Sequence, residues 1–273
     1  MADDWRELNR ANWDERVVVH LGSAGYDLGP LRAGRGRLNA IDEAELGPVA
    51  GLRVLHLQCH FGKDSLVLAG RGAEVTGLDF SGPAVETARL LAAELGLAAR
   101  FVQADLYDAP AAVPEPASFD LVYTTWGTIT WLPDLAGWAR VVAHFLRPRG
   151  ALYFADAHPA VLVFDDMAGV DAGGRPGWFM PYFGGEPLVI DDPSDYADPQ
   201  AQLVNQRQVN WLHPLGAILD ALRAAGLRLE WLHEHPRVPW RMFRCLVPDA
   251  EGCWAWPDHP WLPLSVSLCA VRS

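Results

Sequence analysis

The sequence predicts an α/β fold in which a parallel sheet is covered by helices on both faces. After an amino-terminal stretch, short apolar runs alternate with helical segments at the lengths of βαβ units. The runs RVLHL (53–57) and LVYTT (121–125) contain too little polar alternation for a sheet that faces water on one side. Helix-start signals separate the runs, as at Ser81 before Gly82-Pro83.

The expected elements follow from the apolar periodicity. Trp5, Leu8, Trp13 and Val17 recur at roughly helical spacing between charged residues, so the chain should begin with a helix. The elements predicted next are strand 52–57, helix 64–72, strand 73–78, helix 83–96, strand 99–104, strand 119–125, helix 133–146, strand 151–157, helix 214–226, strand 227–235 and strand 263–273. The Trp/Pro-rich loop 248–263 between the last two strands is consistent with an antiparallel edge.

Composition shifts divide the chain into four segments. Residues 1–47 are expected to form a helical cap, and residues 48–158 a Rossmann-like core. Residues 159–206 are rich in Gly, Pro, Asp and aromatics without a helical period, which predicts an inserted hairpin or lid. Residues 207–273 resume the strand and helix pattern and should complete the core sheet.

Charge and cysteine content limit the classes of partner. The 273-residue chain has a formal net charge of -12 at pH 7, so it lacks the positive field that attracts nucleic acid or anionic membranes. Its four cysteines show no C-x-x-C spacing, and its first residues are charged where a signal peptide would be apolar. No apolar run reaches the roughly 18 residues of a membrane span. We therefore expect a cytoplasmic protein that binds neither nucleic acid nor membrane.

The stretch VLHLQCHFG (54–62) has the form of a strand that runs into a nucleotide-binding loop. In such a unit a glycine lets the backbone approach the ligand, and an acidic residue about 20 positions later bonds the ribose hydroxyls. Gly62 provides the close approach, and Asp79 ends the next strand 17 residues further on. This spacing suits a ribose, although the full G-x-G-x-x-G pattern of dinucleotide-binding proteins is missing.

This loop resembles that of the class I S-adenosylmethionine (SAM)-dependent methyltransferases, and more narrowly a bacterial branch with an LQCHFG loop and a downstream VTGxDFS motif. The resemblance covers about residues 9–160. It implies a Rossmann-like, seven-stranded and mostly parallel sheet with an antiparallel edge, a helical cap, a SAM-binding core and an inserted lid. The usual family loop has an acidic residue followed by three alternating glycines. Here His56 takes the acidic position, Gln58 and His60 take the first two glycine positions, and Gly62 keeps the third.

The resemblance also implies where SAM contacts the chain. The segment TGLDFS should contact the ribose, FVQADLYD the adenine, and TTWG the methionine end and the acceptor, while Trp13-Asp14 resembles a motif on a helix that closes over SAM. The predicted cofactor-binding residues are Trp13, Gln58, Cys59, His60, Gly62, Asp79, Phe80, Ser81, Asp105, Leu106, Thr125 and Trp126. Simpler roles stay open: the aspartates could cap helices, the tryptophans could pack the core, and Cys59 could be an apolar filler. His60 is interpreted as a loop histidine rather than a catalyst.

Candidates for a general base follow the later strands. His158 and His213 are the predicted catalytic bases, with Asp156 as an alternative, although either histidine could simply bond backbone or cap a helix. The aromatic density of the insert and the later loops suits an apolar or ring-bearing acceptor. The predicted substrate-binding residues are Tyr26, Trp126, His158, Tyr182, Trp211 and His213. The cluster His233-Glu234-His235 has no evident third ligand at metal spacing, so we expect no metal.

Together these patterns predict a SAM-dependent methyltransferase. We expect it to move a methyl group to an oxygen or nitrogen atom of a small-molecule acceptor and to release S-adenosylhomocysteine (SAH). Two alternatives stay open: an NAD(P)-dependent oxidoreductase that uses the same kind of loop, and a SAM-binding regulatory protein without catalysis, which the substituted glycines would suit.

Overall fold

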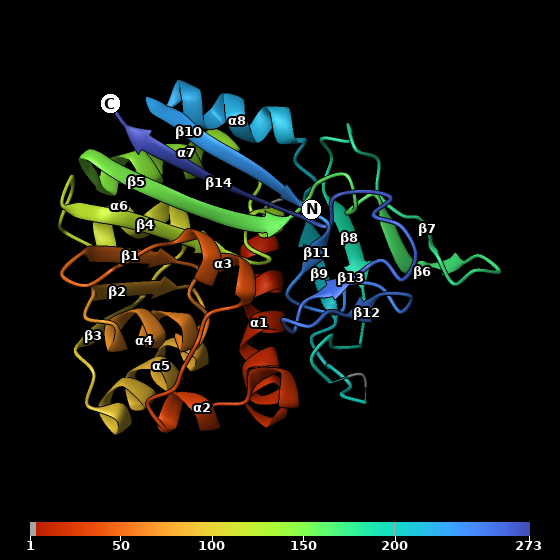
Figure 1. Cartoon of the computed structure of the whole chain (residues 1–273), viewed down its shortest axis with the longest axis horizontal. Helices are drawn as coiled ribbons and strands as arrows, with labels where there is room; N and C mark the ends of the chain where they lie inside the picture. The colour runs from red at the N-terminus through yellow and green to blue at the C-terminus, as the bar shows by residue number, and fades with distance from the viewer. Residues whose placement is uncertain (1–3, 199) are drawn as a thin grey trace.

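The computed structural model describes residues 4–198 and 200–273. Its centre is a seven-stranded sheet with the order β10-β14-β5-β4-β1-β2-β3 (Figure 1). These strands are β1 (Arg53–Leu57), β2 (Glu74–Asp79), β3 (Ala99–Gln103), β4 (Phe119–Thr125), β5 (Leu146–Ala157), β10 (Leu227–His235) and β14 (Ser265–Arg272). β14 pairs antiparallel with β5 and β10, and the other neighbours pair in parallel. The predicted mostly parallel sheet with an antiparallel edge is confirmed.

Helices cover both faces of this sheet. One face packs against α4 (Lys63–Gly70) and α5 (Gly82–Leu95), and the other against α7 (Leu135–Phe145) and α8 (Leu215–Ala224). Val54 belongs to the apolar cluster on the first face, whereas Leu55 and Leu57 belong to the cluster on the second. Successive side chains of a strand point to opposite faces, so an uninterrupted apolar run is buried on both sides. Three short helices in the connections were not predicted: η2 (Leu106–Asp108), α6 (Ala109–Ala112) and η3 (Ile129–Trp131).

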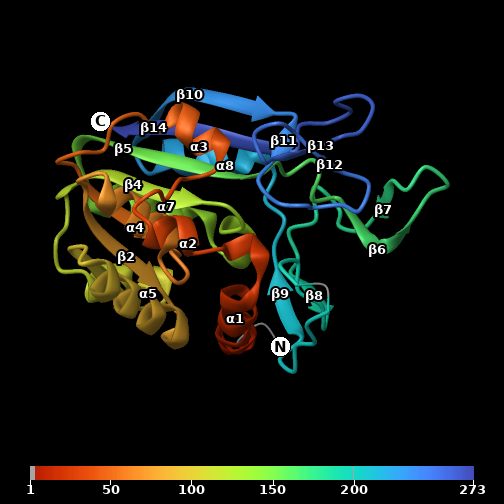
Figure 2. The ribbon, with the colours of Figure 1, turned by 60° about the horizontal axis from the view of Figure 1, so that its bottom comes forward.

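A long amino-terminal helix, α1 (Trp5–Gly22), lies beside the carboxyl ends of the parallel strands (Figures 1 and 2). Its buried side includes four polar residues at helical spacing, Asn9, Asn12, Arg16 and His20, while Val18 on the same helix is 74% exposed. Buried polar groups need hydrogen-bond partners, so this face is built to meet polar partners rather than a purely apolar core. The short elements η1 (Ala24–Tyr26), α2 (Gly29–Arg32) and α3 (Ala40–Glu45) connect α1 to β1.

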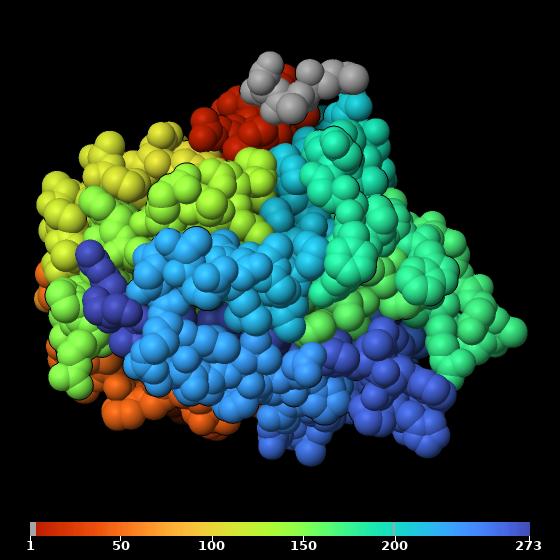
Figure 3. Space-filling model, turned by 90° about the horizontal axis from the view of Figure 1, so that it is seen from above, coloured from red at the N-terminus to blue at the C-terminus, as the bar shows by residue number. Residues whose placement is uncertain are grey.

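The insert at residues 159–206 consists of antiparallel pairs. β6 (Phe164–Val170) pairs with β7 (Pro176–Trp178), and β8 (Leu188–Asp191) pairs with β9 (Arg207–Asn210), which lies just past the predicted end of the insert. The space-filling view shows this green and cyan segment projecting beyond the core (Figure 3). β9, the strand that follows the insert, packs along α1 and forms a wall next to the strand ends.

The predicted loop 248–263 is corrected, because it carries part of a small sheet. Strands β11 (Arg237–Val238), β13 (Trp254–Ala255) and β12 (Val247–Pro248) form a separate three-stranded sheet. A third apolar cluster holds it, with Phe243 and Leu246 at its centre. Strands of two residues leave no alternating pattern in a sequence, and the prolines at 257, 260 and 263 after β13 are typical of a loop.

Within the described ranges, 4–198 and 200–273, no helix combines the length and the apolar character that crossing a membrane would require.

Candidate active site

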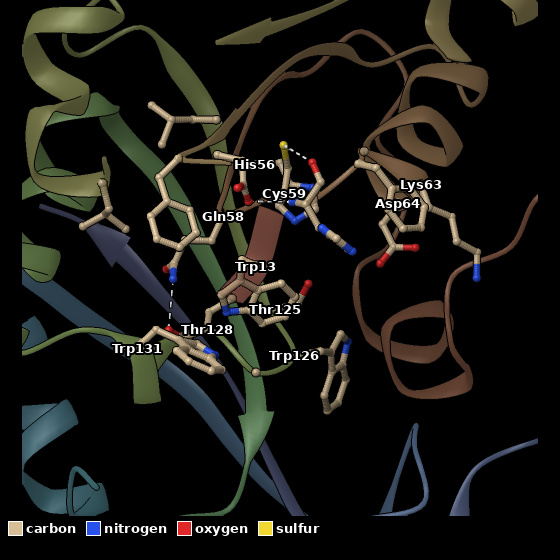
Figure 4. Close-up of a pocket in the computed structure, with 18 of the residues that line it drawn as sticks. Trp13, His56, Gln58, Cys59, Lys63, Asp64, Thr125, Trp126, Thr128 and Trp131 are labelled. Atoms are coloured by element: carbon tan, nitrogen blue, oxygen red, sulfur yellow. Dashed lines mark hydrogen bonds between the residues drawn. The ribbon is translucent and has the colours of Figure 1, made fainter. Parts of the chain in front are cut away.

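A pocket of about 1050 Å³, partly open to solvent, lies where the carboxyl ends of β1, β2 and β4 face α1 (Figure 4). Ligands of open α/β sheets bind at this edge, outside the carboxyl ends of the strands. The pocket collects all but one of the predicted cofactor residues: Trp13, Gln58, Cys59, His60, Gly62, Asp79, Phe80, Asp105, Leu106, Thr125 and Trp126. The predicted acceptor contact Tyr26 also lines it. Ser81 lies outside the lining and instead caps α5 by accepting a hydrogen bond from the N–H of Ala84.

The loop after β1 keeps the backbone shape of a glycine loop without its glycines. Gln58, His60 and Gly62 have φ values of 56°, 52° and 75°. These are the left-handed conformations that glycine adopts freely, and each costs another residue about 1–2 kcal/mol. The three residues stand where the resemblance put the three family glycines. The backbone is therefore strained at Gln58 and His60.

The Gln58 and His60 side chains are held by specific partners. Nε2 of Gln58 donates to the carbonyl oxygen of Thr128 at 3.0 Å (Figure 4), while its Oε1 is buried and has no partner among the described residues. Nε2 of His60 lies 2.9 Å from Nδ1 of His20 on α1. A buried acceptor without a donor beside a pocket is a place where a ligand N–H can bind.

Gly62 is fixed by steric contacts as well as by its backbone angle. A Cβ atom at this position would lie 2.7 and 2.8 Å from ring carbons of Phe101 and 2.9 Å from Cβ of Ala88. Gly62 is also the residue just before α4. The side chains of Phe101 and Ala88 therefore pack against the point where the loop joins this helix.

We expect Gly62→Ala to lower the free energy of unfolding by about 2–4 kcal/mol, because left-handed strain adds to overpacking. The matched control is Gly96→Ala. Its φ is 64° but no atom lies within 4 Å of the new Cβ, so only the strain of about 1–2 kcal/mol applies. Urea denaturation of both variants measures the difference, and equal losses would show that the contacts with Phe101 and Ala88 are not limiting.

Asp79 is buried at the end of β2 and accepts two backbone hydrogen bonds. The N–H groups of His60 and Ser81 lie 2.8 and 2.9 Å from its carboxylate oxygens. Burial raises the pKa of Asp79 to about 6, although both hydrogen bonds oppose the shift. Asp79 thus ties the loop after β1 to the loop after β2, and the carboxylate oxygens retain lone pairs for further donors.

Asp105 follows β3 and caps the amino-terminal end of η2. Its Oδ1 accepts from the N–H of Tyr107 at 2.9 Å, and its Oδ2 lies 3.3 Å from Nε of Arg6 on α1. Burial raises the pKa of Asp105, against that hydrogen bond and the charge of Arg6. Leu106 is almost fully buried beside it, so this corner offers a carboxylate next to an apolar surface.

Trp126 forms the wall after β4 and is also in a left-handed conformation, with φ of 57°. Its Nε1 donates to Asp42 at 2.8 Å, and the hydroxyls of Tyr123 and Tyr153 lie 2.6 and 2.9 Å from the same carboxyl group. Asp42 has no exposed surface. Burial raises its pKa to about 6, against the hydrogen bonds it accepts. This buried group orients the indole at the pocket.

Asp156, the alternative base, anchors the turn after β4. Its two oxygens accept from the backbone N–H groups of Gly127, Thr128, Ile129 and Ala157 at 2.7–3.2 Å. It does not line the pocket. With its lone pairs engaged, Asp156 is placed to hold the backbone rather than to accept a substrate proton.

The structure does not bring His158, His213, Tyr182 and Trp211, which were predicted to act on or bind the acceptor, into the lining of this pocket. Nδ1 of His158 accepts from the N–H of Ala160, and its Nε2 lies 3.0 Å from Glu234. His158 follows β5, which stands beyond β4 in the sheet, on the side away from β1 and β2.

The other three residues also lie outside the pocket lining. Nε2 of His213 lies 2.7 Å from the carbonyl oxygen of Leu132. The hydroxyl of Tyr182 accepts from the N–H of Leu215 at 3.1 Å. The ring of Trp211 packs edge-on against Trp5, which itself lines the pocket. His213 and Trp211 therefore contact residues of the pocket wall, whereas Tyr182 contacts Leu215, which is outside the lining.

The His233-Glu234-His235 cluster lies on the edge strand β10. His233 and His235 approach Glu45 at 2.8 and 3.5 Å, whereas Glu234 approaches His158. The two histidines share a face, as the alternation of a strand requires, and Glu234 points to the other.

Several pocket residues escaped the sequence analysis: Trp5, His56, Lys63, Asp64, Thr128, Trp131 and Tyr196. Tyr196 comes from the insert, far along the chain from the motifs, so spacing could not place it. His56 was noted only for its position in the loop. Its Nδ1 lies 2.8 Å from the hydroxyl of Ser65, and burial lowers its pKa to about 3. His56 is therefore neutral where the family loop is acidic.

Residues 54–150 match the family described as "Methyltransferase domain". Among curated proteins, the chain is 34% identical over 111 residues to a "Ubiquinone biosynthesis O-methyltransferase" of Ralstonia nicotianae, covering 41% of this chain and 45% of that protein. The protein of the same name from Proteus mirabilis is 27% identical over 176 residues, 64% of each chain. The chain thus spans about half to two thirds of the length of these relatives.

Solved structures share the fold over most of the chain. A SAM-dependent methyltransferase from Mesorhizobium loti has a TM-score of 0.57 at 23% identity and covers 93% of this chain and 100% of that one. A putative SAM-dependent methyltransferase from Listeria monocytogenes has a TM-score of 0.60 at 16% identity, with 90% and 99% covered. Geranyl diphosphate C-methyltransferase from Streptomyces coelicolor, solved with SAH, has a TM-score of 0.52 at 14% identity, with 85% and 77% covered.

Proposed function

We propose that this chain, which carries a class I SAM-dependent methyltransferase domain, transfers the methyl group of SAM to an oxygen atom of a small molecule. The observation that carries the proposal is the pocket itself. It brings together the loop after β1, Asp79, Asp105 and Trp126, which lie at the ends of four strands, and it is bounded by α1.

The residues present fit SAM. The Asp79 carboxylate suits the ribose hydroxyls, and Asp105 with Leu106 suits the adenine amino group and ring. Because His56 is neutral, we assign the α-ammonium group to the unpartnered Oε1 of Gln58. When bound, SAM supplies a methyl group on a positively charged sulfur. The acceptor atom attacks the methyl carbon in line with the carbon–sulfur bond, and the sulfur leaves.

The chain's own residues position the reactants and limit water. Trp13 and Trp131 pack edge to face at 5.3 Å on the pocket wall, and Trp126 faces the same cavity (Figure 4). Aromatic faces favour a cation, and a rigid aromatic wall can hold two reactants at attack distance. We propose a hydroxylated aromatic ring as the acceptor, because the pocket is lined with rings and the matched relatives are named O-methyltransferases.

A matched pair of acceptors tests this proposal. Purified protein is incubated with methyl-labelled SAM and either catechol or o-phenylenediamine, which present two hydroxyls or two amines on the same ring. We expect labelled methyl ether and an equal amount of SAH with catechol, and much less product with the diamine. Labelled product only with the diamine would show that the enzyme methylates nitrogen and would contradict the proposed oxygen acceptor. SAH formation no higher than without acceptor would count against both rings.

We also propose a cytoplasmic location. Cys59, Cys245, Cys253 and Cys269 are all free thiols, and unpaired cysteines are usual in reducing compartments.

A further inference from the structure

Three side chains from distant parts of the sequence form a continuous chain of contacts that ends in the pocket. Nδ1 of His20, on α1, lies 2.9 Å from Nε2 of His60 in the loop after β1. Nε2 of His20 lies 3.1 Å from Oδ2 of Asp195, in the insert after β8. His60 lines the pocket, while the side chains of His20 and Asp195 have no exposed surface. We call Asp195, His20 and His60 the relay.

The polar face of α1 brings the relay together. Asn9 exchanges two hydrogen bonds with the backbone of Val209, and Nδ2 of Asn12 donates to the carbonyl oxygen of Asn205 at 2.6 Å. Nη1 of Arg16 donates to Oδ2 of Asp195 at 2.7 Å. These contacts fasten the insert to α1, so Asp195 stands behind the pocket although it is 135 residues after His60 in the sequence.

The contacts define one arrangement of protons along the relay. Burial opposes ionisation of Asp195, but the hydrogen bond from His20 and the charge of Arg16 hold the pKa of its carboxyl below the usual range. An ionised carboxylate only accepts hydrogen bonds, so Nε2 of His20 must donate to it. In the neutral ring, Nδ1 of His20 is then an acceptor, and Nε2 of His60 donates to it. Nδ1 of His60 is left without a proton, and no described residue hydrogen bonds to it.

We infer that the relay makes Nδ1 of His60 the general base of the proposed methyl transfer, an inference that rests on the proposed function. Nδ1 takes the proton of the acceptor hydroxyl while the oxygen–methyl bond forms and the sulfur–methyl bond breaks, its electron pair staying on sulfur. The proton on Nε2 of His60 then passes to Nδ1 of His20. The positive charge ends on His20, beside the Asp195 carboxylate.

Packing holds both imidazoles in place. His20 stacks on Tyr26 with ring centroids 4.5 Å apart and planes 10° apart, and His60 packs edge-on against Trp13 at 5.3 Å. His60 also keeps its left-handed conformation, a strain that glycine would avoid. A base must be held in one orientation to act in the transition state, and these contacts provide that.

The groups around His60 favour its unprotonated form at neutral pH. Three elements bring titratable or charged groups close to His60: α1 carries His20 and Arg16, η1 carries Tyr26, and the insert carries Asp195 and Tyr196. Asp79 in addition accepts a hydrogen bond from the backbone N–H of His60. Burial, and then the charge of His20, lower the pKa of His60 well below its usual value, while Asp195 opposes that shift. Removing the Asp195 charge should therefore make His60 a weaker base.

Histidine tautomers test the relay without an assay of activity. Long-range ¹H–¹⁵N correlation spectra are recorded at pH 7.5 on ¹⁵N-histidine-labelled wild-type protein with SAH. His60→Asn and His20→Asn assign the two signals; asparagine tolerates the left-handed conformation at position 60. We expect both rings to carry their proton on Nε2. A proton on Nδ1 of His60, or a His60 ring protonated on both nitrogens, overturns the relay.

Catalysis is tested with catechol and SAM. Asp195→Asn should lower kcat by about tenfold to a hundredfold and move the acidic limb of the pH profile to lower pH, with the Kd for SAM within about twofold of wild type. His60→Asn should lower kcat by at least about a hundredfold and remove that limb. The control is Asp192→Asn in the same segment, whose carboxylate bonds only Ser194; it should match wild type.

The outcomes separate this inference from the proposed function. If wild-type protein does not bind SAM, the proposed function fails. If it binds SAM and methylates catechol, but Asp195→Asn and His60→Asn keep the wild-type rate and pH profile, only the relay fails. If it binds SAM without methylating catechol, the tautomer spectra decide the relay alone. A loss of rate in Asp195→Asn without a shift of the acidic limb indicates a structural role and contradicts the relay.

Discussion

Replacing Asp79 with alanine should weaken SAM binding by about 1–3 kcal/mol, which is roughly a 5- to 150-fold higher Kd. The carboxylate would lose its hydrogen bonds to the ribose hydroxyls, and the loops it joins would lose their common acceptor. Isothermal titration with SAM measures the change. Asp108→Ala is the control, because this exposed aspartate stands at the end of η2 outside the pocket lining. Unchanged affinity in Asp79→Ala would remove Asp79 from the site.

Asp79 also predicts a pH dependence for SAM binding. Its pKa is raised to about 6 in the folded protein, so the carboxyl gains a proton as the pH falls through 6 and loses acceptor capacity. We expect the wild-type Kd to rise below pH 6. Asp79→Asn should bind more weakly at pH 7.5 and change less between pH 7.5 and pH 5. A wild-type Kd that is constant over this range would contradict the assignment.

The second large effect is expected at Asp42. Asp42→Ala should lower the free energy of unfolding by about 3–5 kcal/mol, because it leaves the hydroxyls of Tyr123 and Tyr153 and the indole N–H of Trp126 without their acceptor. Urea denaturation measures the loss. Asp27→Ala is the control, since Asp27 is exposed and bonds only the N–H of Gly29; its loss should stay below about 1 kcal/mol.

Asp42 should also make the free energy of unfolding depend on pH. Its folded-state pKa of about 6 lies above its ordinary value of 3.8, so the folded protein binds more protons than the unfolded chain between these values. The contribution of Asp42 to stability is therefore largest below about pH 4, falls as the pH rises to about 6, and is constant above. Asp42→Asn removes this contribution. An identical pH dependence in wild type and Asp42→Asn would refute the raised pKa.

The core of the fold follows from local patterns. RVLHL predicted a strand buried on both faces because every second residue meets the same helical layer, and Val54 and Leu55 indeed belong to opposite layers. Asp79 was placed at the site by its spacing after Gly62, and Asp105 by the resemblance to the methyltransferase family; both lie at strand ends on one edge of the parallel sheet. The same logic predicted His158 at the site, but the structure places it outside the pocket lining. It also follows a parallel strand, but β5 stands on the far side of β4 from β1 and β2, and strand order is not written in local sequence.

The relay was out of reach of sequence patterns for a related reason. Asp195 meets His20 only because the insert folds back onto α1, a long-range contact made through Asn9, Asn12 and Arg16. The apolar periodicity of α1 predicted a helix that packs through Trp13 and Val17, but it gave no signal that the polar residues Asn9, Asn12 and Arg16 are buried. His60 looked like an ordinary loop residue, since its left-handed conformation and its contact with His20 are properties of the folded chain.

Binding of SAM in the pocket is the central claim, and titration calorimetry of the purified wild-type protein tests it most directly. SAM, SAH, NADH and NADPH are titrated in parallel under the same conditions. The account predicts binding of SAM and SAH with Kd values on the order of micromolar, and no heat from either nicotinamide cofactor. Binding of NADH or NADPH, or no binding by any of the four, would contradict it.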